Sequence, residues 1–579
     1  MIRITQLKLH PEEGPKSLER AVRKHLHLKD SEAFSYEVLR RSIDARKKPD
    51  LYEIYTLQVQ FKDSQTERRI LRKKLSNVEA FEPVRYRFAG KPLKHRMETI
   101  TNPDRPLIIG TGPAGLFCGL LLAREGLCPI LIERGQRAKE REKSVRSFWE
   151  TGTLDPDSNV QFGEGGAGTF SDGKLNTGVK DPGGRIRFIL ETFVQFGADP
   201  DILSSAKPHV GTDILKRVVA SITQEICERG GEVHFSTRME KMHPDQDGIW
   251  QVSCVSTAAD SGILDGSDRK TGTVCFSARH LVLAIGHSSR DTFCMLKDSG
   301  IIMRPKAFAV GVRIQHPQEI IDRAMYGENC RYDLPVSSYK LTHRLANGRG
   351  VYSFCMCPGG YIVNASSEEG GLAVNGMSYH DRSSKSANSA IVVTVSPEEI
   401  ARYLHPGPPD PEPENGSAPI VSSGMGPLLG MEFQRQLERA AHLAGGGAIP
   451  VQRFGDFLRS DPGCGIRLPD YEPRILGRWK PASIRQIFPE DIAAGIEEGI
   501  LSWERQISGF SSPDALLCAA ESRTSSPVRI ERGPDLQALD FPGLYPCGEG
   551  AGYAGGITSA AADGLRVAEQ ILEHTARIM

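Results

Sequence analysis

Three closely spaced glycines offer the clearest chemistry in the sequence. Gly110-x-Gly112-x-x-Gly115 follows the short apolar stretch 107–109 and opens an apolar helix. In nucleotide-binding folds the first glycine permits a tight turn, the second lets the backbone approach a pyrophosphate, and the third lets the helix pack on the strand. Glu133 ends the next apolar strand, where a carboxylate can accept hydrogen bonds from unphosphorylated ribose hydroxyls. The spacing therefore predicts a site for NAD or FAD rather than NADP.

A second glycine-rich segment, near the other end of the chain, distinguishes the two cofactors. Gly548-Glu549 follows an apolar strand, and Gly555-Gly556-Ile557 leads into the terminal helix. This segment resembles the second flavin motif of the FAD-dependent oxidoreductase superfamily with a glutathione-reductase-type FAD domain. In that superfamily the carboxylate binds the ribityl chain, and the helix N-terminus faces the flavin ring and stabilises negative charge there. The resemblance implies FAD.

Other segments agree in chain order with the same superfamily. They are the glycine-rich loop 163–175, the strand 231–239 that approaches adenine, and the apolar strand 279–286. More narrowly, strings such as 352–360 and 548–556 resemble the bacterial family of uncharacterised FAD-dependent dehydrogenases. The family's substrate is not established, so the resemblance implies fold and cofactor but not the reaction. Together these patterns predict that FAD is bound by Gly110, Gly112, Pro113, Ala114, Gly115, Glu133, Arg134, Gly165, Gly166, Gly168, Thr169, Lys174, Leu175, Met239, Ala284, Gly286, Gly548, Glu549, Gly555, Gly556 and Ile557.

Residues for the catalytic step are not conspicuous. His209, Arg290, Arg523, Cys355 and Cys357 are the polar groups within the family-like strings. On a regular strand the two cysteines would point to the same face. A buried histidine, structural ion pairs and packing thiols explain these residues without catalysis, so we leave the catalytic residues unassigned.

The motifs require a discontinuous α/β fold. We predict a Rossmann-like FAD-binding domain at 101–300 and 518–579, interrupted by a mixed α+β domain at 301–517. Substrate would bind between the inserted domain and the flavin ring. Residues 1–100 precede these as a small α+β domain with a ferredoxin-like order of elements, ending in a strand at 84–88.

Several stretches are expected to connect these units. The polar insertions 256–272 and 405–426 cannot bury a core and are predicted to be surface loops. The first insertion joins a predicted hairpin between strands 250–255 and 273–276. Residues 89–105 are expected to form a linker.

Composition limits the class of protein. The chain has 579 residues, of which 39% are hydrophobic and 25% charged, as in ordinary globular proteins. No apolar stretch approaches the roughly 20 residues of a membrane span. The 12 cysteines are dispersed and include no CxxC pair, so they predict no metal site and no redox dithiol of that spacing. With no secretory signal at the N-terminus, the expected location is the cytoplasm.

The balanced net charge conceals a basic N-terminal unit. Residues 1–100 carry 23 basic and 14 acidic side chains, although the whole chain has 72 of each. Such a unit can dock on the acidic remainder of its own chain, on an acidic partner or on nucleic acid. Nucleic acid is the less favoured partner and is left open.

The favoured function is an FAD-dependent oxidoreductase that transfers a hydride between a small molecule and FAD. No separate nicotinamide domain is recognisable in the sequence, so NAD(P)H would have to enter the substrate cleft transiently. Two alternatives remain. One is an RNA-associated flavoprotein that uses the basic N-terminal domain, and the other is a flavin-binding protein without turnover.

Overall fold

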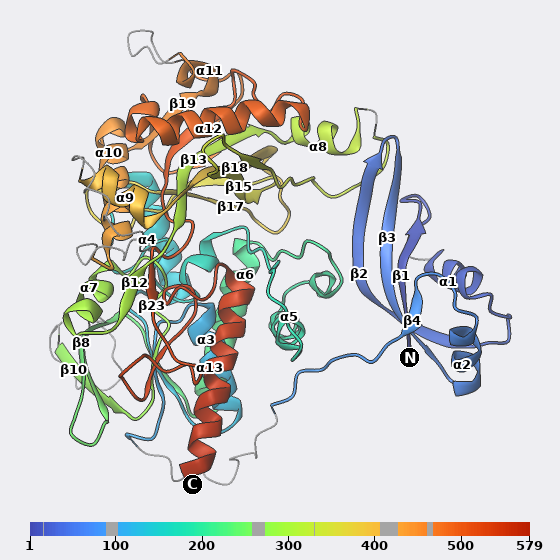
Figure 1. Cartoon of the computed structure of the whole chain (residues 1–579), viewed down its shortest axis with the longest axis horizontal. Coiled ribbons are helices and arrows are strands. Elements are labelled where there is room, and N and C mark those ends of the chain that lie inside the picture. Colours follow the sequence, from blue (N-terminus) through green and yellow to red (C-terminus); the bar gives the residue numbers. More distant parts are fainter. Residues whose placement is uncertain are drawn as a thin grey trace, which may run out of the picture.

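Figure 1 shows a small N-terminal unit, drawn in blue, beside a larger body. The computed structural model describes residues 1–14, 17–88, 102–256, 272–328, 330–405, 426–459 and 467–578. The expected linker and the two polar insertions lie almost entirely outside these residues. Within them, no helix is both long and apolar enough to cross a membrane.

The N-terminal unit is a four-stranded antiparallel sheet with two helices. Its strands have the order β2-β3-β1-β4 in the sheet. Ile2 and Ile4 of the first strand alternate with polar residues and are fully buried, as is Val22 of the first helix, so alternate apolar positions build the core. The elements are β1 (Ile2–Leu9), α1 (Leu18–Leu26), β2 (Phe34–Lys47), β3 (Asp50–Phe61), α2 (Ser64–Arg72) and β4 (Val78–Ala80).

The prediction of a strand at 84–88 is wrong. The last strand of this unit is β4, and residues 81–88 are irregular. Tyr86 lies against Phe188 with ring centroids 4.8 Å apart, and its hydroxyl donates to Glu569 at 2.9 Å. These partners belong to the body. Tertiary contacts therefore override the apolar alternation of this segment.

The N-terminal unit docks on the body through its edge strand β2. The backbone N–H of Arg41 donates to the oxygen of Ser204 at 2.6 Å, and the N–H of Ala206 donates to the oxygen of Arg41 at 2.8 Å. Arg187 of the body pairs with Glu37 at 2.9 Å. The N-terminal unit thus contacts its own chain, but in this ion pair the carboxylate belongs to the N-terminal unit and the arginine to the body, which is the reverse of a basic unit docking on an acidic surface.

A five-stranded parallel sheet forms the centre of the body, with strand order β24-β11-β5-β6-β7. Its inner strands are short, continuously apolar and buried, as expected when helices cover both faces of a sheet. The helix after the first glycine motif packs against the C-terminal helix and α6. The elements are β5 (Leu107–Ile109), α3 (Pro113–Arg124), β6 (Ile130–Ile132), α6 (Thr212–Glu228), β7 (Glu232–His234), β11 (Leu281–Leu283), β24 (Leu544–Pro546) and α13 (Ile557–Ile578).

A small antiparallel sheet and several helices extend this part of the body. The predicted hairpin is confirmed, because β9 pairs with β10 on either side of the first polar insertion. A third strand, β8, completes that sheet. The elements are α4 (Ala138–Thr151), α5 (Arg185–Gln195), β8 (Thr237–Pro244), β9 (Trp250–Ser256), β10 (Gly272–Ala278) and α7 (Arg290–Asp298).

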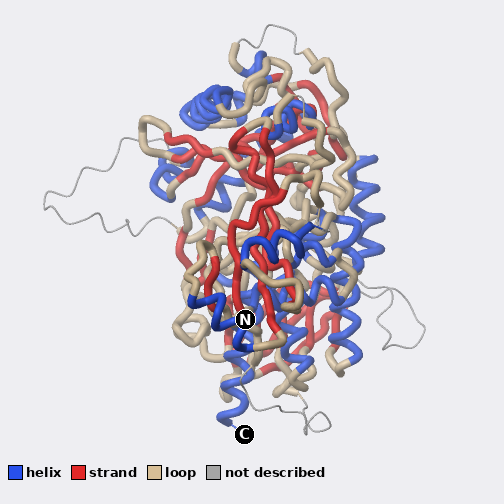
Figure 2. The backbone as a smooth tube through the Cα atoms, turned by 90° about the vertical axis from the view of Figure 1, so that its right-hand side faces the viewer, coloured by secondary structure: helices blue, strands red, loops and turns tan. Residues whose placement is uncertain are grey.

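The inserted region is built on a seven-stranded sheet. Figure 2 views the molecule from the side of the N-terminal unit, with all strands in red. The strand order is β14-β15-β18-β13-β22-β19-β21, and a three-stranded sheet, β17-β16-β20, lies beside it. A short pair, β12 with β23, joins the two parts of the body. The elements are β12 (Met303–Pro305), β13 (Phe308–Pro317), α8 (Gln318–Tyr326), β14 (Thr342–Arg344), β15 (Gly350–Cys357), β16 (Tyr361–Asn364), β17 (Val374–Met377), β18 (Ser386–Val395), α9 (Pro397–Leu404), α10 (Leu429–Gly445), β19 (Ile449–Arg453), α11 (Phe454–Phe457), β20 (Ile475–Leu476), β21 (Trp479–Pro481), α12 (Glu490–Ser502), β22 (Leu516–Glu521) and β23 (Val528–Ile530).

One strand crosses the boundary expected at residue 517. β22 begins at Leu516 and continues to Glu521. It pairs with β13 on one side and β19 on the other, so it belongs to the inserted sheet along its whole length. The inserted sheet therefore extends beyond residue 517.

Candidate active site

A cavity of about 340 Å³ lies at the carboxyl ends of β5, β6, β11 and β24. The loops after all four strands contribute to its lining, and ligands usually bind at this edge of a parallel α/β sheet. The expected cofactor residues in the lining are Gly110, Gly112, Pro113, Ala114, Glu133, Arg134, Gly166, Gly168, Lys174, Met239, Ala284, Gly286, Glu549, Gly555, Gly556 and Ile557. The expected residues outside the lining are Gly115, Gly165, Thr169, Leu175 and Gly548.

The three glycines of the first motif lack side chains for different reasons. Gly110 has a φ of 104°, and a Cβ there would lie 2.3 Å from the backbone oxygen of Ala284. A Cβ at Gly115 would lie 1.9 Å from the backbone oxygen of Gly110. At Gly112 the nearest atom, on Gly166, would be 3.9 Å away. The first and third glycines thus serve packing within the chain, whereas the second keeps space open beside the N-terminus of α3.

The N-terminus of α13 offers a similar opening. Gly286, Gly555 and Gly556 line the cavity, and a Cβ at any of them would meet no described protein atom within 4 Å. Side chains at these positions would fill cavity space. The glycines therefore keep a cradle open along the N-termini of α3 and α13, which suits the diphosphate and the flexible ribityl chain of FAD.

Glu133 joins three loops at the wall of the cavity. Its Oε2 accepts hydrogen bonds from the N–H and hydroxyl of Thr111, and its Oε1 accepts from the N–H groups of Gly135 and Gly163, all at 2.8–3.0 Å. A carboxylate offers about four lone-pair positions. Protein donors therefore already use its acceptor capacity, and the ribose contact expected from the sequence would have to share it.

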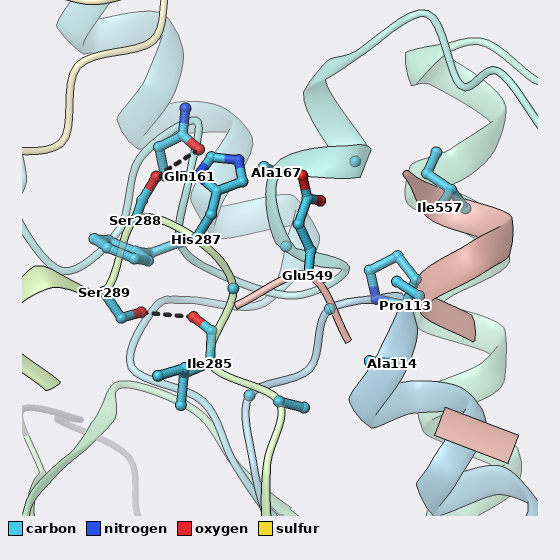
Figure 3. A pocket seen from close by; sticks show the side chains of 18 of the residues that line it. Pro113, Ala114, Gln161, Ala167, Ile285, His287, Ser288, Ser289, Glu549 and Ile557 are labelled. Atoms are coloured by element: carbon cyan, nitrogen blue, oxygen red, sulfur yellow. Dashed lines mark hydrogen bonds between the residues drawn. The ribbon is translucent and has the colours of Figure 1, made fainter. Parts of the chain in front are cut away.

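Glu549 is a carboxyl group with unused acceptors. Figure 3 shows its side chain between the loop of His287 and the first turn of α3, which carries Pro113. Among the described residues it accepts no hydrogen bond, and burial raises its pKa to about 7 despite the opposing charge of Lys306. The group can therefore accept hydrogen bonds from ligand hydroxyls when it is ionised.

A chain of hydrogen bonds orients His287, which the sequence had not assigned a role (Figure 3). The Gln161 amide donates to the oxygen of Ala365, so its oxygen accepts from the Ser288 hydroxyl at 3.2 Å. That hydroxyl then accepts from Nδ1 of His287 at 2.9 Å. Burial is the main reason that the pKa of His287 falls to about 4, and the positive charges of Arg523 and Arg290 lower it further. The ring is therefore neutral at pH 7, with Nε2 left as an acceptor toward the cavity.

Lys174 also lines the cavity and brings a positive charge to it. Its Nζ lies 3.2 Å from the carboxylate of Asp172, which is 1% exposed. Although burial opposes the charged form, that carboxylate raises the pKa of Lys174 above its usual value. Asp172 also accepts from Ser378 at 2.6 Å and from Arg382 at 2.8 Å. Burial alone would raise the pKa of Asp172, but Lys174 and Arg382 hold it well below its usual range.

The two cysteines do not share an environment, contrary to the expectation for a regular strand. Cys355 has a φ of 47°, and the register of β15 shifts between Phe354 and Cys357. Cys355 lines the cavity, whereas Cys357 is fully buried, with its Sγ 4.0 Å from Nζ of Lys174 and 3.9 Å from the guanidinium of Arg313. Burial raises the pKa of Cys357 to about 11. The bulge thus exposes only one thiol to the cavity.

Two of the candidate residues from the sequence, Arg290 and Arg523, bind the same carboxylate, which no sequence motif indicated. Glu438, on α10, is 1% exposed and pairs with Arg290 at 2.8 Å and with Arg523 at 2.7 Å. These partners lie far apart in the chain, so no local motif predicted the cluster. The arrangement favours the structural interpretation of both arginines. His209, the last of the candidate polar residues from the sequence, does not line this cavity.

Comparisons with known proteins agree with a flavin site. The model described as FAD-dependent protein, C-terminal domain-like, matches residues 307–524, and one described as a domain of unknown function matches residues 1–60. A protein of Clostridium beijerinckii, described as uncharacterized, is 41% identical over 576 residues, which cover 99% of this chain and 98% of that protein.

Several solved structures show a more distant likeness. One is the halogenase PltM, as a point mutant in complex with FAD, with 12% identity over 52% of this chain and 55% of that chain and a TM-score of 0.28. Another is aklavinone-11 hydroxylase with FAD and aklavinone, with 13% identity, 52% and 47% coverage and a TM-score of 0.24. A third is a flavoprotein/dehydrogenase from Cytophaga hutchinsonii, with 12% identity, 52% and 57% coverage and a TM-score of 0.23. The alignments thus span about half of each of these chains.

The mixed α/β fold and the glycine cradle define a dinucleotide-binding protein, and the match to the FAD-dependent model identifies the dinucleotide as FAD. The chain belongs to the family of FAD-dependent proteins that includes the clostridial protein, and FAD is its cofactor.

Proposed function

We propose that the protein is an FAD-dependent oxidoreductase that transfers a hydride between a small organic molecule and FAD. The observation that carries this proposal is the shared cavity, which combines the glycine cradle with polar side chains of the inserted region. Bound FAD supplies the two-electron chemistry, because the flavin accepts or releases a hydride. The chain itself has to bind and orient both reactants.

The expected cofactor residues have distinct proposed roles. Gly112 and the N-terminus of α3 would hold the diphosphate, because N–H groups at a helix N-terminus attract anions. The Glu549 carboxylate would accept hydrogen bonds from the ribityl hydroxyls, and the strand around Met239 would contact the adenine. The open space at Gly112 and the unused acceptors of Glu549 support these assignments.

Two side chains are suited to the substrate. The Lys174 ammonium can stabilise negative charge that develops on a substrate oxygen or nitrogen, because it remains protonated beside Asp172. Nε2 of neutral His287 can accept a hydrogen bond from a substrate hydroxyl or amine. Both residues line the cavity, so these contacts would orient a small polar molecule there.

The division of the chain supports the same proposal. We propose a ferredoxin-like N-terminal domain, an FAD-binding domain in two segments, and an inserted domain that ends after β22 rather than at residue 517. The inserted domain reaches the cavity through Cys355, Asn375 and Glu521. Substrate would therefore bind between this domain and the flavin.

The test is the visible spectrum of the purified protein, followed by anaerobic addition of NADH, then NADPH, then a panel of organic hydride donors. Bleaching of the yellow flavin band by NADH or NADPH would identify a reductase, and bleaching by an organic donor would identify a dehydrogenase. A flavin that dithionite bleaches but that no organic donor reduces would contradict hydride transfer and favour flavin binding without turnover.

A further inference from the structure

A second cavity lies between the N-terminal unit and the body. Its volume is about 810 Å³. Residues 41–46 of β2 form one wall, and the body contributes from the segments 199–209, 325–326, 335–338 and 380–382. Neither the glycine cradle nor the proposed hydride transfer uses this space.

One part of this cavity is apolar. Ile43 from the N-terminal unit and Ile202, Met325 and Val336 from the body contribute to the lining. Apolar side chains in a concave site favour the hydrocarbon part of a ligand, because binding removes both surfaces from water. The ligand therefore needs an apolar portion.

Another part of the lining has an excess of positive charge. The Lys207 ammonium donates to the hydroxyl of Ser338 at 2.9 Å and forms no ion pair among the described residues. Arg382 donates to Asp172 at 2.8 Å, and its Nε is buried without a partner among those residues. Asp172 is also paired with Lys174 at 3.2 Å. Asp172 is thus shared by two cations, Lys174 and Arg382. Lys207 adds a third positive charge that has no carboxylate partner among the described residues.

The neighbouring histidine does not change this balance. Desolvation and then Arg382 lower the pKa of His209 to about 4, so its ring is neutral at pH 7. The ring stacks on that of His380, with centroids 5.5 Å apart. Desolvation and then Arg382 also lower the pKa of Lys207. A bound anion would relieve this repulsion between the two cations.

The other two basic side chains of the lining are each paired with a carboxylate. Arg41 pairs with Glu53 at 2.6 Å, and Arg46 pairs with Asp44 at 2.7 Å. The other carboxylates of the lining, all on exposed residues, are those of Asp199, Asp201 and Asp381. Among the basic side chains of the lining, only Lys207 therefore has no carboxylate partner among the described residues.

The two cavities share a thin wall. Lys174, which lines the first cavity, forms a backbone β-bridge with His209, which lines the second. The N–H of Leu175 donates to the oxygen of Pro208 at 3.0 Å beside this bridge. The ion pair between Asp172, which lines the first cavity, and Arg382, which lines the second, crosses the same wall. A ligand in the second cavity would thus lie next to the polar side of the flavin cavity.

We propose that the second cavity binds an organic anion, with its carboxylate or phosphate at Lys207 and Arg382 and its apolar part against Met325 and Val336. This site is additional to the proposed hydride transfer, because binding there requires no flavin chemistry.

Isothermal titration of the FAD-loaded protein tests this site. The probes are 4-phenylbutyrate, its neutral amide 4-phenylbutanamide, and inorganic phosphate. We expect 4-phenylbutyrate to bind about 10-fold more tightly than the amide, because hydrogen bonds to a charged group are the stronger ones. It should also bind more tightly than phosphate, which has no apolar part. Sodium chloride should weaken the binding by screening.

Variants locate the binding within the molecule. Lys207→Gln should weaken 4-phenylbutyrate about 10-fold, whereas Lys340→Gln, an exposed lysine outside this cavity, should leave it unchanged. Val336→Asp should also weaken it, by placing negative charge beside the apolar part. Equal affinity for acid and amide, full binding by Lys207→Gln, or no binding of 4-phenylbutyrate would overturn the proposal. Flavin reduction by the same samples is recorded separately, so failure of the proposed function remains distinguishable.

Discussion

Oε2 of Glu133 accepts hydrogen bonds from both the backbone N–H and the hydroxyl of Thr111, at 2.9 and 2.8 Å. Its other oxygen receives two further backbone donors. In Glu133→Gln an NH₂ group would face two of these donors, and each unsatisfied buried group costs about 1–3 kcal/mol. We predict a lower thermal midpoint for the FAD-free protein and weaker FAD binding, measured by melting and by flavin fluorescence titration.

The control for this prediction is Glu150→Gln, on the exposed face of α4. It should melt and bind FAD like the wild type. If Glu133→Gln weakened FAD binding but left the melting of the FAD-free protein unchanged, Glu133 would act on the ribose rather than on the loops.

FAD affinity should depend on pH through Glu549, whose pKa is raised to about 7 by burial. If ribityl hydroxyls donate to the ionised carboxylate, FAD binding favours the deprotonated form and releases a proton below that pKa. The dissociation constant should therefore rise by up to about tenfold for each pH unit below 7 and level off above it. Fluorescence titrations between about pH 6 and pH 8 measure this slope.

The matched variant is Glu549→Gln, which retains one acceptor oxygen but cannot ionise. Its FAD affinity should be weaker at high pH and nearly independent of pH. An affinity that instead increased at low pH in the wild type would mean that protonated Glu549 donates to the cofactor.

The charge of Lys174 should influence the flavin whatever the substrate is. A cation beside the cofactor favours its reduced, more negative state, so Lys174→Gln should lower the midpoint potential. A loss of about 1.4 kcal/mol corresponds to about 30 mV for two electrons. A dye-coupled reduction measures this shift. Lys180→Gln, an exposed lysine outside the cavity, serves as the control, and an unchanged potential in Lys174→Gln would place the ammonium too far from the flavin.

Glu438 should matter for stability more than for chemistry. Removing its charge would leave Arg290 and Arg523 without their shared buried partner, although burial alone would disfavour the ionised carboxylate. Breaking such a buried cluster costs about 3–5 kcal/mol. We expect Glu438→Gln to lower the urea midpoint strongly, whereas Glu432→Gln, half exposed on the same helix, should change it little. An unaltered midpoint would mean that the cluster contributes no net stability.

Local spacing predicted the parts of the molecule where neighbouring residues determine the conformation. The glycine spacing of the first motif placed Gly112 beside a cavity, because a turn between strand and helix is a local structure. The hairpin of β9 and β10 followed from alternating apolar residues on both sides of a polar insertion. Family resemblance, rather than spacing, distinguished FAD from NAD.

The structural features missed by the sequence depend on long-range contacts. Arg290 and Glu438 are 148 residues apart, and only the folded chain joins them. The bulge at Cys355 depends on the pairing of β15 with β18, so the two-residue alternation failed there. Residues 84–88 have a strand-like pattern, but Tyr86 finds its partners in the body instead.

The central claim is that FAD occupies the cavity beside Gly112, and the FAD content of Gly112→Val tests it most directly. A Cβ at Gly112 has no close protein neighbour, so this variant should fold and melt like the wild type while the added side chain fills the diphosphate space. We predict stoichiometric FAD in the wild type and in the exposed control Gly178→Val, and none in Gly112→Val. Stoichiometric FAD in Gly112→Val would contradict the account.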